Sequence, residues 1–194
     1  MLRAVSIPTA VLGGGSFGTC LAVMAARRHD VVLWARRPEV VEAINREHRN
    51  PAHLSDLDLP ESVTATTDLA AAVAGREIVI VAVPSQATRQ VLEEAAPHFG
   101  PDVVLVAAMK GIEVETGMLM SEVFEDVLPE ALRHRVVFLS GPSFAREIAQ
   151  HRPTAVTLAS TVDSYAISVQ ESLSTPWFRC YSHDDVVGSR SAAR

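Results

Sequence analysis

The sequence predicts an α/β fold, a doubly wound and mostly parallel sheet of the Rossmann-like type. Apolar runs that suit buried strands alternate with helical patterns along the 194 residues, with no internal repeat. A glycine-rich turn follows the first apolar run and opens the first helix. Aromatic residues make up only 5%, so Val, Ala, Leu and Ile must form the core, as is typical of buried parallel strands.

Strands are expected where short apolar runs lie between charged or turn-forming residues. The run at residues 77–83 is almost continuously apolar, which predicts a strand buried on both faces. The expected strands are residues 10–12, 30–34, 64–67, 77–83, 103–107, 136–139, 155–158 and 177–181.

Helices are expected between these strands, where apolar residues recur at helical spacing. Pro38 suits the first turn of one helix, and Asp68 suits the N-cap of another. The segment at residues 50–61 contains prolines and aspartates and predicts a loop. The first expected helix opens at the glycine turn and has Phe17, Leu21 and Met24 on one face. The other expected helices are residues 38–46, 69–74, 85–98, 118–128, a short one after Ser143, and 162–173.

The glycine turn fits the G-x-G-x-x-G pattern of dinucleotide-binding proteins through Gly13, Gly15 and Gly18. Gly13 permits the sharp turn, Gly15 lets the main chain approach a pyrophosphate, and Gly18 lets the helix lie close to the strand. The phosphates would then contact unpaired N–H groups at the helix start. The turn therefore predicts a dinucleotide site.

The end of the second strand bears on the choice between NAD and NADP. An acidic residue there would bind the free ribose hydroxyl of NAD, but this sequence has Arg36 and Arg37 and no acid before Glu39. Guanidinium groups suit a ribose phosphate, so we expect NADP, with NAD use still open. The alternative is that Arg37 simply points to solvent.

Two further residues lie where parallel strands end, the edge at which such sheets bind ligands. Lys110 follows the strand at residues 103–107, and Ser143 follows Gly141 and Pro142 at an expected helix start. The hydroxyl and N–H groups near Ser143 could hold an anion. Lys110 could have a functional role because it emerges at the ligand-binding edge. The alternatives are a surface lysine and an ordinary helix cap.

Composition excludes several classes. The net charge of −6, without a basic run, argues against nucleic-acid binding, and no apolar stretch approaches the length of a membrane span. Cys20 and Cys180 are far apart and there is no signal-peptide pattern, which favours a reduced, cytoplasmic protein. The seven histidines show no metal-ligand spacing, so we expect no metal site.

Taken together, these motifs resemble the N-terminal domain of the bacterial type of NAD(P)-dependent glycerol-3-phosphate dehydrogenase. Related dehydrogenases share the glycine turn but lack the lysine and Gly-Pro-Ser-Phe-Ala loops. The matching strings are GGGSFGT from Gly13, LWARR from Leu33, VAVPSQ from Val81, KGIE from Lys110, SGPSFA from Ser140 and DDVVG from Asp184.

The resemblance implies reversible reduction of dihydroxyacetone phosphate to sn-glycerol 3-phosphate, the backbone of membrane phospholipids, by a cytoplasmic and homo-oligomeric enzyme. Lys110, Gly141 and Ser143 would contact the phosphorylated substrate. The residues that it places at the cofactor are Ser16, Phe17, Arg36, Arg37, Lys110 and Ala145. Phe17 stands where the family often has tryptophan.

The resemblance ends at Gly188, so we expect residues 1–188 to form the cofactor domain and 189–194 to be a non-family tail. The family continues with a Gly-Ala-Leu-Lys-Asn stretch that holds its catalytic lysine, and then with an all-helical domain. Neither is in this sequence, so we expect a truncated or frameshifted chain with little activity and no catalytic residue of its own. The alternatives are a non-catalytic NADP-binding module with a helical partner chain, and a dehydrogenase of hydroxy acids.

Overall fold

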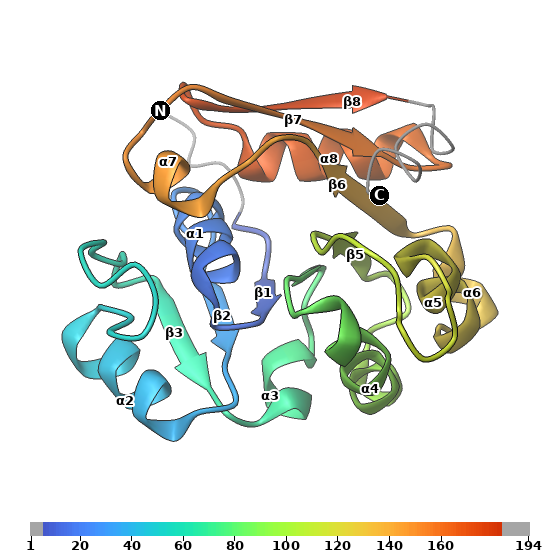
Figure 1. Cartoon of the computed structure of the whole chain (residues 1–194), viewed down its shortest axis with the longest axis horizontal. Coiled ribbons are helices and arrows are strands. Elements are labelled where there is room, and N and C mark those ends of the chain that lie inside the picture. Colours follow the sequence, from blue (N-terminus) through green and yellow to red (C-terminus); the bar gives the residue numbers. More distant parts are fainter. Residues whose placement is uncertain (1–5, 184–194) are drawn as a thin grey trace.

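The computed structural model describes residues 6–183, which form one eight-stranded sheet (Figure 1). The strand order is β3-β2-β1-β4-β5-β6-β7-β8. Neighbouring strands are parallel except β6 and β7, which are antiparallel. The strands are β1 (Thr9–Leu12), β2 (Val31–Trp34), β3 (Val63–Thr66), β4 (Ile78–Val81), β5 (Val104–Ala107), β6 (Val136–Ser140), β7 (Thr154–Ala159) and β8 (Phe178–His183). The predicted doubly wound, mostly parallel sheet is confirmed.

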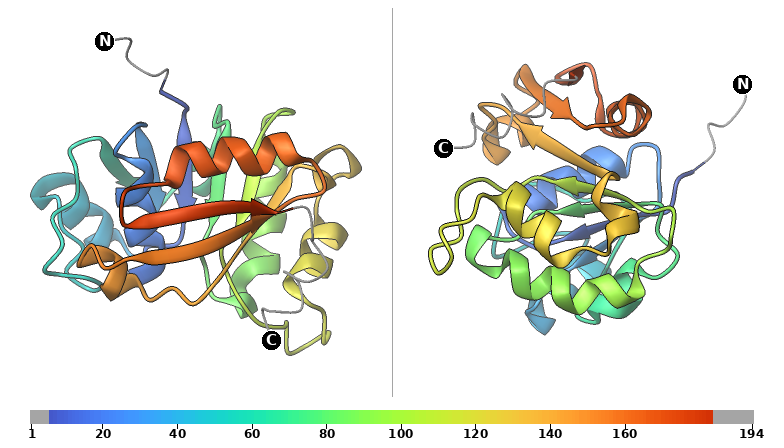
Figure 2. Two further views of the ribbon diagram at one scale, coloured as in Figure 1. Left: turned by 90° about the horizontal axis from the view of Figure 1, so that it is seen from above. Right: turned by 90° about the vertical axis from the view of Figure 1, so that its right-hand side faces the viewer.

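Helices cover both faces of this sheet (Figure 2). On one face lie α1 (Ser16–Ala25), α2 (Pro38–Glu47), α7 (Ala145–Ala149) and α8 (Asp163–Leu173). On the other lie α3 (Leu69–Val73), α4 (Ser85–Ala95), α5 (Met120–Val127) and α6 (Glu130–Arg133). A short 3₁₀ helix, η1 (Ala96–His98), extends α4.

Alternating side chains along the central strands supply the two cores. In β4, Ile78 and Ile80 point into the core beneath α1, whereas Val79 and Val81 point into the core beneath α4. Because successive residues of a strand face opposite sides, a strand covered on both faces must be apolar throughout. This explains why residues 78–83 are all apolar.

Most predicted elements are confirmed, with boundaries shifted by one or two residues. Asp68 caps α3 as expected, since its side chain accepts a hydrogen bond from the Ala71 N–H at 3.0 Å. The helix predicted at 118–128 begins only at Met120, and α6 was not predicted. A single turn such as α6 is too short to show helical periodicity in the sequence. The predicted domain end at 188 and the tail lie outside the described residues, as does the DDVVG string.

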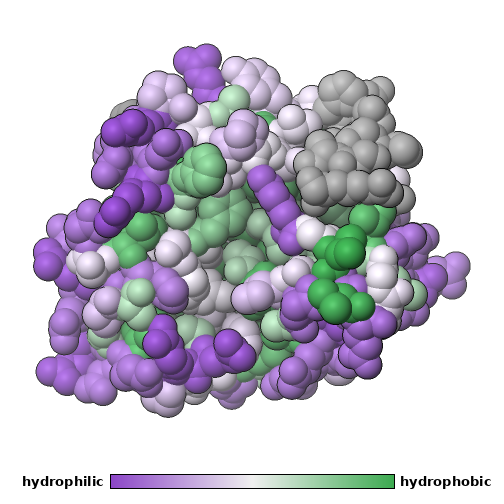
Figure 3. All heavy atoms as spheres, in the orientation of Figure 1, coloured by the Kyte–Doolittle hydropathy of each residue, from purple (hydrophilic) through white to green (hydrophobic). Residues whose placement is uncertain are grey.

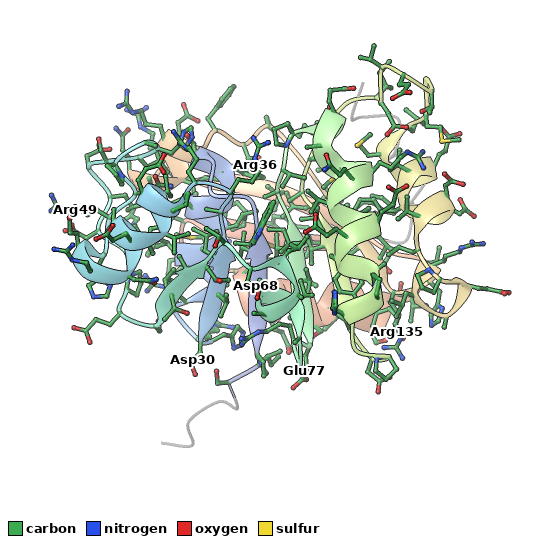
Figure 4. All side chains as sticks on the ribbon, turned by 90° about the horizontal axis from the view of Figure 1, so that it is seen from below. Asp30, Arg36, Arg49, Asp68, Glu77 and Arg135 are labelled. Atoms are coloured by element: carbon green, nitrogen blue, oxygen red, sulfur yellow. The ribbon has the colours of Figure 1, made fainter. Side chains whose placement is uncertain are left out.

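The carboxyl ends of β1, β2, β4 and β5 meet at one edge of the sheet. Figure 4 shows Arg36, which follows β2, at this edge, whereas Asp30 and Glu77, which precede β2 and β4, lie at the opposite edge. The loops after these strands therefore surround a common space, as parallel sheets of this kind require. Within residues 6–183, no helix has the length and apolar character needed to cross a membrane.

Candidate cofactor and substrate site

The glycine turn between β1 and α1 is held by close main-chain contacts. Gly13 has a φ of +125°, and a Cβ there would lie 2.6 Å from the carbonyl oxygen of Ala82. A Cβ on Gly18 would overlap the carbonyl oxygen of Gly13. Both positions therefore require glycine, which confirms the tight turn and the close approach of helix to strand predicted for them.

Gly15 differs from these two glycines because the space beside it is open. A Cβ on Gly15 would have no heavy atom within 4 Å, and its φ of −78° is one that any residue adopts. It is the N-cap of α1, so the first N–H groups of that helix have no partners within the helix. This open, electropositive helix start fits a pyrophosphate group.

Two residues that support the turn were missed in the sequence. Gly14 lies so close to β2 that a Cβ would come within 2.7 Å of the Ala35 Cβ. Asn50, completely buried, donates from Nδ2 to the Gly14 carbonyl at 2.9 Å and to the Thr19 hydroxyl at 2.8 Å. No local pattern predicts this, because the contacts join residues 31 and 36 positions apart.

Arg36 and Arg37 follow β2 and line the cleft together with Trp34. The Trp34 indole is only 7% exposed and donates from Nε1 to the Thr67 carbonyl at 3.0 Å. The Arg37 guanidinium lies 3.9 Å from the exposed Glu39 carboxylate, a contact too exposed to immobilise it. Both guanidinium groups therefore stay available to an anion at the cleft rim.

The cleft itself has a volume of about 700 Å³ and appears as the hollow at the centre of Figure 3. Apolar and weakly polar residues form its floor, and its rim carries hydrophilic residues together with a hydrophobic patch on the right-hand side of the view (Figure 3). Its lining includes these predicted site residues: Gly13, Gly15, Ser16, Phe17, Arg36, Arg37 and Lys110. A volume in this range suits a drug-sized or nucleotide-sized ligand.

Lys110 follows β5 and enters the cleft from the side opposite Arg36. Its ammonium group donates to the carbonyl oxygen of Gly141, which follows β6. Lys110 is also the only lysine among the 194 residues. An ammonium has three donors, so two remain for a ligand oxygen. This contact brings the loops after β5 and β6 together, as strand order alone predicts.

Three predicted site residues that follow β6 do not line the cleft: Gly141, Ser143 and Ala145. Gly141 nevertheless contacts the ammonium group of Lys110 through its carbonyl oxygen. Gly141 has a φ of +145°, and a Cβ there would lie 3.0 Å from the Ala155 carbonyl oxygen, so the approach of β7 requires glycine. Ser143 was expected at the start of a helix, but Phe144 occupies the N-cap of α7. The Ser143 hydroxyl instead lies 3.5 Å from the Gly141 carbonyl oxygen. Ala145 is half-buried as the first residue of α7.

His53 is a further cleft residue that the sequence analysis did not single out. It comes from the loop at 48–62, and its Nδ1 lies 3.4 Å from the Ser16 hydroxyl. Asn50 holds this loop by accepting a hydrogen bond from the His53 N–H at 3.2 Å. The loop therefore forms one wall of the cleft next to the start of α1.

Comparisons with known proteins give the family of the chain. Residues 8–166 match the family model described as NAD-dependent glycerol-3-phosphate dehydrogenase N-terminus. The chain is 47% identical over 179 residues to the glycerol-3-phosphate dehydrogenase (NAD(P)+) of Myxococcus xanthus, which covers 92% of this chain and 53% of that protein. It is 46% identical over 187 residues to the enzyme of the same name from Corynebacterium urealyticum, covering 96% and 56%.

A solved structure gives the same result. The glycerol-3-phosphate dehydrogenase of Coxiella burnetii is 32% identical and superposes with a TM-score of 0.85, covering 94% of this chain and 55% of that one. The chain thus spans about half the length of the relatives it matches. From the matched residues and the shared sheet, the chain belongs to the NAD-dependent glycerol-3-phosphate dehydrogenase family and corresponds to its N-terminal part.

Proposed function

We propose that this chain is the NAD(P)-binding half of a glycerol-3-phosphate dehydrogenase, which interconverts dihydroxyacetone phosphate and sn-glycerol 3-phosphate in the cytoplasm. The observation that carries the proposal is the single cleft that joins the start of α1, the arginine pair after β2, and Lys110. The bound nicotinamide would supply or accept the hydride. The described residues bind and orient the two reactants.

The start of α1 holds the cofactor pyrophosphate, and the open space beside Gly15 lets the phosphates reach the main chain. Arg36 and Arg37 contact the ribose phosphate of NADPH, which favours NADPH over NADH. Ser16 and Phe17, at the same helix start, form the wall beside the phosphates. The pyrophosphate fits this position because Gly15 is the N-cap of α1 and the space beside its Cα is open.

Lys110 faces the substrate and stabilises the negative charge that develops on the carbonyl oxygen during hydride transfer. Gly141 and Ser143, on the adjoining loop, complete the substrate contacts, and Ala145 contacts the cofactor. The contact between Lys110 and the Gly141 carbonyl supports a shared site on these two loops.

Proton transfer is assigned by the resemblance to a lysine outside these 194 residues. We therefore expect the 194-residue polypeptide to bind NADPH but to oxidise it slowly with dihydroxyacetone phosphate. A positioned general acid contributes about 10²–10⁴-fold to rate. NADPH oxidation at ordinary dehydrogenase rates by this polypeptide would contradict the expectation.

The test is a titration of the polypeptide with NADPH and NADH, followed by Trp34 fluorescence. Trp34 lies in the cleft wall, and a Trp34→Phe variant shows which part of the signal comes from Trp177. Saturable binding, tighter for NADPH, supports the proposal. In Arg36→Ala/Arg37→Ala, the loss of charge-assisted hydrogen bonds should weaken NADPH binding about tenfold or more and leave NADH unchanged. A folded protein that binds neither nucleotide refutes the proposal.

A second candidate function is that of a cofactor-binding module that works with a separate helical partner chain. Exposed apolar side chains favour it, namely Ile112 and Val114 after β5 and Phe144 after β6. Val114 is 78% and Phe144 is 68% exposed, and exposed apolar patches typically mark an interaction surface. If a partner restores activity in trans, this function holds. If the polypeptide is monodisperse by light scattering and no partner does so, the second candidate fails.

A further inference from the structure

The side chain of Gln86 forms hydrogen bonds with the loop that carries Lys110, at Ile112 and Val114. The Gln86 amide nitrogen donates to the Ile112 carbonyl at 2.8 Å, and its amide oxygen accepts from the Val114 N–H at 2.9 Å. These two bonds reproduce the pattern with which one strand pairs with another. A single side chain on the first turn of α4 thus replaces a strand as the partner of this loop.

Glu113 lies between Ile112 and Val114 in the chain, and its carboxylate holds the same loop through separate hydrogen bonds. Glu113 is only 6% exposed and accepts from Arg89 Nε at 3.0 Å and from Arg89 Nη2 at 3.0 Å. The Thr116 hydroxyl donates to the same carboxylate at 2.5 Å. Arg89 also pairs with Asp126 of α5 at 2.5 Å. Residues 112–114 are therefore held by α4 from two directions.

Lys110 is joined to this anchored segment through Gly111, whose φ of +111° permits the change of direction. Within residues 6–183, the Lys110 side chain has one recorded contact, its hydrogen bond to the Gly141 carbonyl, and the ammonium is exposed. A long, exposed lysine with one hydrogen bond does not order itself, because its rotamer entropy opposes this. Its position depends on where the main chain is held.

We propose that Gln86 is a positioning residue, which holds the main chain at Ile112 and Val114 and so keeps the Lys110 ammonium directed across the cleft. The expected effect on NADPH binding rests on the proposed function. The expected effect on the order of the Lys110 side chain concerns the free protein and does not depend on it. Gln86 is itself exposed and fills no part of the core, so its hydrogen bonds serve the loop rather than the packing of α4.

The single lysine makes the test direct. Protein grown with ¹³C,¹⁵N-lysine carries the label at one residue only, so the NMR signals of its Cε–Hε group and of its main-chain amide report on Lys110 alone. Gln86→Met keeps the length of the side chain and removes both hydrogen bonds. Gln86→Glu keeps the acceptor for Val114 and removes the donor. Gln90→Met, an exposed position one turn later, is the matched control.

In the wild type and in Gln90→Met, we expect dispersed, inequivalent Hε signals from an ordered side chain. In Gln86→Met these should merge toward the shift of a freely rotating lysine, and Gln86→Glu should lie between. Exchange of the Val114 amide, followed in separate, uniformly ¹⁵N-labelled protein, should accelerate about tenfold in Gln86→Met. The NADPH dissociation constant of Gln86→Met should rise about 3- to 10-fold, as expected for the loss of one or two ordinary hydrogen bonds.

Unchanged Lys110 signals and unchanged Val114 exchange in a folded Gln86→Met protein would overturn the proposal. Equal changes in Gln90→Met would also overturn it, because the effect would then be general loosening of α4. If even the wild type fails to bind NADPH, the proposed function fails, whereas the Lys110 signals of the free protein still decide the role of Gln86.

Discussion

The substitution Gly18→Ala tests the closest contact at the glycine turn. A Cβ at this position would overlap the Gly13 carbonyl oxygen and lie 3.0 Å from the Gly13 carbonyl carbon and 3.4 Å from the Ala82 Cβ. Because the two nearest atoms belong to the main chain of a tight turn, α1 must move away from β1. Overpacking typically costs about 1–3 kcal/mol, and the overlap here places the cost near ~3 kcal/mol. Alanine regains about 1 kcal/mol through its higher helix propensity, so we expect a net loss in the free energy of unfolding of about 2 kcal/mol.

In a chain of 194 residues, that loss corresponds to a fall in Tm of roughly 4–8 °C, measurable by circular dichroism at the helix band. Gly15→Ala is the matched control, because its Cβ would meet nothing within 4 Å. We expect its stability to stay within about 0.5 kcal/mol of the wild type, while NADPH binding weakens because the methyl group would occupy the space proposed for the phosphates. Equal stability losses in both variants, or none in Gly18→Ala, would refute the reasoning.

Three further predictions concern residues around the site. Asn50→Ala should cost about 2–3 kcal/mol in urea unfolding, because buried hydrogen-bonding groups lose their partner; an unchanged midpoint would contradict this. The hydrogen bonds from Arg89 hold the pKa of Glu113 below its usual 4.5, so its stabilisation is complete above that pH and is lost as the pH falls through the lower, folded-state pKa. The stability difference between the wild type and Glu113→Gln should therefore shrink below about pH 4.5, and a difference independent of pH would be the contrary result. Burial raises the pKa of Cys20 to about 12 and that of Cys180 to about 11, so at about pH 8 a thiol reagent should modify them only after unfolding, whereas rapid reaction of the folded protein would show that they are accessible.

Much of the site could be predicted because its residues follow strand ends. Once strands and helices alternate, parallel pairing brings the loops after β1, β2, β4 and β5 to one edge, whatever the side chains. Gly13, Arg36 and Lys110 could therefore be assigned to one cleft from their places in the chain. Ser143 could not be placed as accurately, since a helix start one residue later leaves its hydroxyl beside the Gly141 carbonyl.

By itself, the sequence determined the fold class, the glycine turn and the resemblance to a dehydrogenase family, because these depend on local periodicity and on residues close together in the chain. Only the tertiary structure decided that Gly14 is required, that Asn50 ties the loop at 48–62 to the turn, and that Gln86 and Arg89 hold the segment after Lys110. These contacts join residues 21 to 36 positions apart. No local pattern encodes them, since they form only when the sheet has brought separate loops to the same edge.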